Sequence, residues 1–114
     1  MIEPRLAAHM LVSALRRQAE AHGGFAMVIR KGDPEAGSLM IIRREKGENP
    51  TIFEPVPGSS VTREWREIVH QDIDSEEYIS KYCQRLASRD PDIWIIELDV
   101  PFAQRFTDIL AAIS

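Results

Sequence analysis

Four charged residues lie in or beside strongly apolar segments and are the best candidates for a polar site: Arg30, Asp33, Asp92 and Glu97. Glu97 alternates with two isoleucines, so it shares one face of an extended apolar segment with them. A buried carboxylate needs a partner or becomes neutral, and Arg30, or else Arg43 or Arg44, could supply the positive charge. The structural interpretation is an ion pair at a sheet end. The functional alternative is a pocket for a polar ligand in a small binding domain or enzyme.

The other chemistry-bearing residues lack the spacing that catalysis or metal binding requires. The chain contains no Glu-x-Lys or Asp-x-Lys pair, which the restriction-endonuclease-like arrangement would need to hold a metal. The three histidines form no metal-ligand pair, and no glycine-rich phosphate loop is present. Cys83 falls on the apolar stripe of a helical segment, which is typical of an inert core thiol. We therefore expect no catalytic residue, no metal and no cofactor.

Two pairs of adjacent arginines raise the possibility of phosphate or RNA binding: Arg16, Arg17, Arg43 and Arg44. They could converge if the first helix packs near the first two strands. The net charge of −4, and strands without an aromatic pair clearly placed for base stacking, make nucleic acid the less favoured partner.

A protein partner or a homodimer is the favoured hypothesis, and three residues mark a candidate surface: Trp65, Pro34 and Glu35. If Trp65 is exposed, it would anchor a partner, whereas a buried Trp65 would merely close the sheet. Pro34 and Glu35 lie at the tip of a predicted turn. An open sheet edge would also favour self-association.

Hydrophobic periodicity and turn residues predict the elements that position these side chains. The expected helices cover about 4–22, a segment capped by Asp74 with Glu77 three residues later, and a last segment from Pro101. The expected strands cover about 25–31, 38–45, 51–54, 64–70 and 93–98. This α-β-β-β-β-α-β-α order predicts an α+β fold with a mixed, mainly antiparallel five-stranded sheet and flanking helices.

Two further expectations concern the apolar strands. Asp33, Pro34 and Gly37 suit a tight turn, so the strands at 25–31 and 38–45 are predicted to form a hairpin. The strands at 25–31 and 93–98 are apolar on both faces, which is typical of interior strands covered on both sides.

Size and composition favour a small cytoplasmic domain. A chain of 114 residues fits one domain spanning 1–114. Cys83 is the only cysteine, so no internal disulfide can form, as expected in a reducing cytoplasm. No apolar run reaches the roughly 20 residues that a membrane span needs, so no membrane contact is expected.

Three stretches together resemble DUF1491, a bacterial family of unknown function: Glu3–Leu6, Arg30–Gly37 and Arg89–Glu97. Their order and spacing match over about residues 3–99, while the last helix looks less like the family. The resemblance implies a small stand-alone domain and carries over no catalytic residue.

Overall fold

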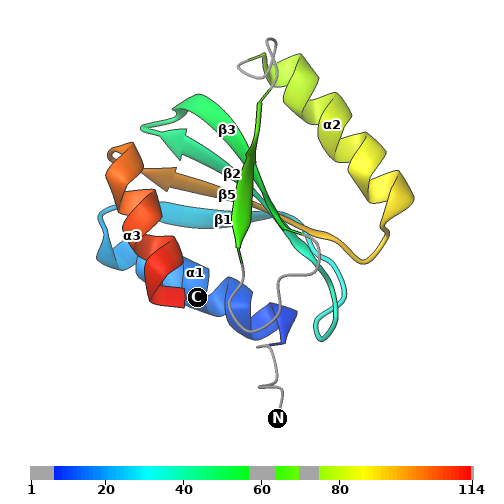
Figure 1. Cartoon of the computed structure of the whole chain (residues 1–114), viewed down its shortest axis with the longest axis horizontal. Helices are drawn as coiled ribbons and strands as arrows, with labels where there is room; N and C mark the ends of the chain where they lie inside the picture. Colours follow the sequence, from blue (N-terminus) through cyan, green and yellow to red (C-terminus); the bar gives the residue numbers. More distant parts are fainter. Residues whose placement is uncertain (1–6, 57–63, 70–74, 114) are drawn as a thin grey trace.

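The computed structural model describes residues 7–56, 64–69 and 75–113. Within these residues, three helices and five strands follow the predicted α-β-β-β-β-α-β-α order (Figure 1). The helices are α1 (Ala8–Ala21), α2 (Glu76–Arg89) and α3 (Ala103–Ile113). The strands are β1 (Phe25–Arg30), β2 (Leu39–Glu45), β3 (Glu48–Pro55), β4 (Trp65–Ile68) and β5 (Trp94–Val100).

The strands form one mixed sheet in the order β1-β5-β2-β3-β4. β5 pairs in parallel with β2, and the β1–β5, β2–β3 and β3–β4 pairs are antiparallel. The predicted α+β class and mainly antiparallel sheet are therefore confirmed.

Helices cover the two faces of the sheet unequally: α1 and α3 lie on one face and α2 on the other (Figure 1). The larger apolar cluster joins α1 and α3 to one face of β2 and β5, with Leu15, Ile96, Leu98 and Ile109 fully buried. The smaller cluster joins Ile79 of α2 to β2, β3 and the start of β5. No β1 residue belongs to this second cluster.

The predicted hairpin between β1 and β2 is wrong, because β5 lies between these strands and pairs with both. The tight turn is real, with the Gly37 N–H donating to the Asp33 carbonyl at 3.2 Å. Its role is to carry the chain across the start of β5. Local turn chemistry cannot distinguish a loop that joins two neighbours from a loop that spans an inserted strand.

The expectation of two interior strands holds for β5 and is wrong for β1. All but two of the β5 residues are buried, and the strand has a neighbour on each side. β1 is an edge strand in which Ala26 and Val28 pack against the larger cluster. The opposite face of β1 is open to solvent. The apolar residues on both faces of β1 resemble those of an interior strand. The sequence does not show that α2 leaves one of these faces uncovered.

Smaller differences concern the ends of elements. Ser75, not Asp74, is the N-cap of α2, because its hydroxyl accepts a hydrogen bond from the Tyr78 N–H at 3.3 Å. Asp74 lies outside the described residues, as do the predicted helix start at Pro4 and the strand end at His70. α1 begins at Ala8 after Ala7.

Candidate functional site

The segment 31–37, here called the crossing loop, holds Asp33 in a structural role. The N–H groups of Glu35 and Ala36 donate to Asp33 Oδ1 at 2.9 and 2.8 Å. These backbone hydrogen bonds, with that from Ala36 the stronger, keep the pKa of Asp33 below its ordinary value. The carboxylate thus closes its own turn.

The backbone of the crossing loop is bound to the start of β5. The Asp33 N–H donates to the Asp92 carbonyl at 2.9 Å, and the Trp94 indole N–H donates to the Asp33 carbonyl at 2.7 Å. A methyl group on Gly32 would lie 2.1 Å from the Asp92 oxygen, so glycine is required for this approach. The loop is therefore a packed part of the fold.

Arg30 and Asp92 lie beside this contact and bind neighbouring backbone groups. Arg30 donates to the carbonyls of Lys31 and Ile93 at 3.3 and 3.5 Å. The Asp92 side chain is exposed at the surface. Three of the four predicted polar residues thus gather around the start of β5, where they support the crossing loop.

Glu97 lies further along β5 and pairs with Arg44, one of the two alternatives to Arg30. Arg44 Nε donates to Glu97 Oε1, and both side chains are largely buried, at 14% and 16% exposure. Two further nitrogens of Arg44 donate to the carboxylate of Glu76 on α2 at 2.8 and 2.7 Å. Arg44 therefore joins β2, β5 and α2.

The electrostatics of this cluster favour its charged form. The bidentate contact with Glu76, and then the contact with Glu97, raise the pKa of Arg44 above its ordinary value against the opposing effect of burial. The same contact lowers the pKa of Glu76. Because each of these charges already has a partner, the cluster fixes α2 and is not arranged as an open ligand site.

A groove of about 290 Å³ lies between α2 and the sheet, and Arg44, Glu76 and Glu97 form part of its lining. Its apolar lining comes from Ile29, Ile42, Ile79 and Cys83. Burial raises the pKa of Cys83, so its thiol stays neutral. On the far side of α2, Tyr82 donates to Glu54 of β3, and burial followed by this hydrogen bond raises the pKa of Tyr82.

Ile29, which lines the groove, belongs to a row of three large apolar residues of β1, here called the β1 row: Phe25, Met27 and Ile29. Their exposed fractions are 53%, 47% and 49%. They alternate with Ala26 and Val28, which face the larger cluster, so the row lies on the α2 face of the sheet. The row is exposed because α2 packs over β2, β3 and β5 and stops short of the edge.

The arginine pairs do not converge as the phosphate-binding alternative would require, because Arg43 and Arg44 project from opposite faces of β2. Arg43 donates to Thr51 at 3.0 Å and lies over the rings of Phe53 and Phe106, on the face covered by α3. Arg44 binds Glu76 on the α2 face. Arg16 and Arg17 are exposed on α1, so the four side chains do not form one phosphate-binding surface.

The residues predicted for a partner surface have different environments. Trp65 is partly buried and packs against the larger cluster. Pro34 and Glu35 are exposed, and their carbonyls accept hydrogen bonds from the N–H groups of His9 and Ala8 at 2.9 and 3.1 Å. These two residues therefore complete the N-terminal turn of α1.

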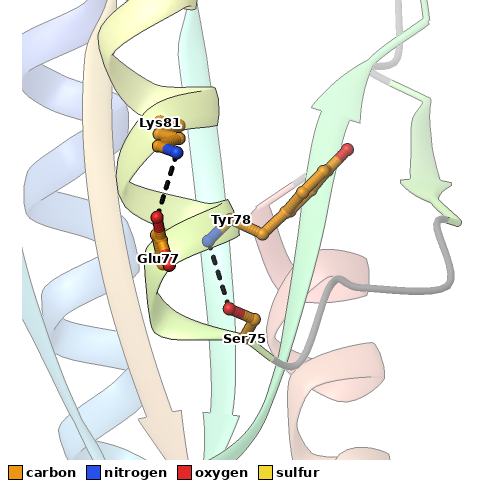
Figure 2. A pocket seen from close by; sticks show the side chains of 4 residues that line it. All are labelled: Ser75, Glu77, Tyr78 and Lys81. Atoms are coloured by element: carbon orange, nitrogen blue, oxygen red, sulfur yellow. Dashed lines mark hydrogen bonds and ion pairs between the residues drawn. The ribbon is translucent and has the colours of Figure 1, made fainter.

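A second hollow, at the first turn of α2, is lined by Ser75, Glu77, Tyr78 and Lys81 (Figure 2). Ser75 binds the Tyr78 N–H, and Lys81 pairs with Glu77 at 3.0 Å one turn away. These contacts are those of a capped, exposed helix.

Residues 7–56, 64–69 and 75–113 contain no cluster of three or more His, Cys, Asp or Glu able to hold a metal. None of the helices described for those ranges is long and apolar enough to cross a membrane.

In the described part of the chain, the fold and the internal contacts of Arg44, Glu97 and Asp33 define a small α+β protein whose sheet ends at the β1 edge. A family model described as "Protein of unknown function (DUF1491)" matches residues 6–108, and the chain belongs to this family.

Two solved structures illustrate the similarity. A crystal structure of a DUF1491 family protein from Caulobacter crescentus CB15 is 31% identical, with a TM-score of 0.72 over 86% of this chain and 89% of that one. The solution structure of protein Atu0922 from A. tumefaciens is 27% identical, with a TM-score of 0.75 over 90% and 92%. A search of curated proteins found no match.

Two of the segments that carry the family resemblance meet in space. The crossing loop supplies Gly32 and Asp33, and the segment before β5 supplies Asp92 and Trp94. Sequence reasoning identified these residues but assigned some of them to a ligand site. It also missed the β1 row, although the alternation of Phe25, Met27 and Ile29 was visible.

Proposed function

We propose that this protein is a non-catalytic, cytoplasmic interaction domain that binds another polypeptide through the β1 edge and its adjoining groove. The observation that carries the proposal is the β1 row, in which three large apolar side chains are each about half exposed on a strand that forms the edge of the sheet among the described residues. Exposed apolar surface next to a free edge favours addition of a strand from a partner.

The polar residues support the same proposal. Arg44 pairs with Glu76 and Glu97, and Asp33 accepts hydrogen bonds from the backbone of its own turn. These contacts stabilise the fold. The exposed surface of the groove is mainly apolar, although Arg44, Glu76 and Glu97 also line it, and this apolar part suits a hydrophobic side chain from a partner.

Site-specific photo-crosslinking in the native host tests the proposal. A photoreactive amino acid at Met27 should give a defined protein adduct. The same group at Met10, a methionine of 49% exposure on α1, should give none and serves as the matched control. Absence of an adduct specific to position 27 would contradict the proposal.

A further inference from the structure

The β1 edge can pair with itself, and we propose that its partner is a second copy of this chain. This inference rests on the proposed function, because it assigns the occupant of the same surface. Two β1 strands would pair antiparallel about a two-fold axis perpendicular to the sheet. The sheets of the two copies would then become continuous, with α2 of each copy on the same side.

Only one register pairs every residue of the β1 row with an apolar residue of the same row in the second copy. When Met27 faces Met27 of the second copy, Phe25 faces Ile29 at both ends of the pair. A shift by two residues in either direction leaves only two apolar pairs and moves an end residue past the strand. Directly opposed residues of antiparallel strands share a face, so the self-centred register forms one apolar stripe of six side chains.

The charges of β1 are compatible with this arrangement. The segment from Phe25 to Ile29 contains no charged residue, although charged side chains are a common protection of exposed edges. Arg30 and Lys31 follow at one end only. The two-fold axis puts the basic residues of the two copies at opposite ends of the strand pair, beside the uncharged start of the partner strand, so the basic groups are kept apart.

The size of the contact predicts a weak dimer. The β-bulge between Val28 and Arg30 limits the regular ladder to a few residues. Strand pairing with three half-exposed side chains per copy belongs to the weak class of interfaces, which bury less than about 1,200 Å² in total. We therefore expect a dissociation constant on the order of 10 μM.

Sedimentation velocity of the full chain from about 1 to 500 μM tests the inference. The wild type should change from monomer to dimer across this range. Met27→Lys and Met27→Glu should each weaken dimerisation about tenfold or more, because like charges would meet at the two-fold axis. Met10→Lys is the control for an added charge at an equally exposed methionine and should dimerise like the wild type. Circular dichroism verifies that each variant is folded.

A mixture of the Met27→Lys and Met27→Glu variants tests the register itself. The introduced ammonium of one copy would face the introduced carboxylate of the other, so a heterodimer should form at concentrations where each variant alone is monomeric. A wild type that stays monomeric at the highest concentration would overturn the inference, and so would dimers that persist in both Met27 variants or a mixture that does not associate. If the wild type is monomeric while a photoreactive group at Met27 cross-links to a different protein in cells, the proposed function stands and the second copy is rejected.

Discussion

Replacement of Gly32 by alanine should destabilise the protein because the crossing loop lies directly against the start of β5. The new methyl carbon would lie 2.1 Å from the Asp92 oxygen and 2.6 Å from the Ile93 carbonyl carbon. An ordinary carbon–oxygen contact is about 3.3 Å, so the two backbone segments would have to separate by about 1 Å. Both contacts are with backbone atoms, which cannot rotate away as a side chain can.

The expected cost combines two destabilising effects with one that partly offsets them. Overpacking of this kind costs about 1–3 kcal/mol. Separation of the segments also weakens the hydrogen bond from the Asp33 N–H to the Asp92 carbonyl, worth about 1 kcal/mol. Alanine restricts the unfolded chain and returns about 0.4–1 kcal/mol. The free energy of unfolding should therefore fall by about 1–3.5 kcal/mol.

Urea unfolding followed by circular dichroism and tryptophan fluorescence measures this loss, with an unchanged m-value showing that the transition is comparable. Lys31→Ala is the control, because Lys31 is exposed and adjacent, and it should change the stability by less than about 0.5 kcal/mol. If Gly32→Ala were as stable as the wild type, the close approach of the two segments would be refuted.

Three further predictions concern α2 and its ion pairs. Glu97→Gln should lower the stability by about 1–3 kcal/mol at pH 7, because Arg44 loses a largely buried partner. The control Glu77→Gln, at an exposed pair, should cost under about 0.5 kcal/mol in the same urea assay, and equal losses would contradict the role of Glu97. The pKa of Glu76 is lowered by Arg44, so its contribution is present above its ordinary value of 4.5 and lost as the pH falls through the lower folded value. The difference in stability between wild type and Glu76→Gln should therefore shrink in acid, and a difference independent of pH would count against this pair. Burial raises the pKa of Cys83, so iodoacetamide should modify it several-fold more slowly than a model thiol, as mass spectrometry can measure. A rate equal to that of the model thiol would show that α2 does not shield the groove.

The candidate polar site shows how far residue types alone can lead. Glu97 was expected to need a positive partner, and the structure provides Arg44 from the neighbouring strand. The sequence could not choose among Arg30, Arg43 and Arg44, because β1 and β2 both flank β5 and the choice depends on the register of each pair and on which face each arginine occupies. Glu76 could not be assigned to the same cluster for a similar reason, since its position depends on how α2 docks.

The amino-acid sequence by itself determined the type and order of the elements, the turn at Asp33–Gly37 and the amphipathic character of the helices. These features depend on periodicity and on backbone preferences over a few neighbouring residues. Only the tertiary structure decided that β5 inserts between β1 and β2, that α2 leaves the β1 row uncovered, and that Arg43 and Arg44 serve opposite faces. Strand order and helix docking depend on contacts between distant segments, because an apolar strand has the same local pattern whether its faces meet a helix or solvent.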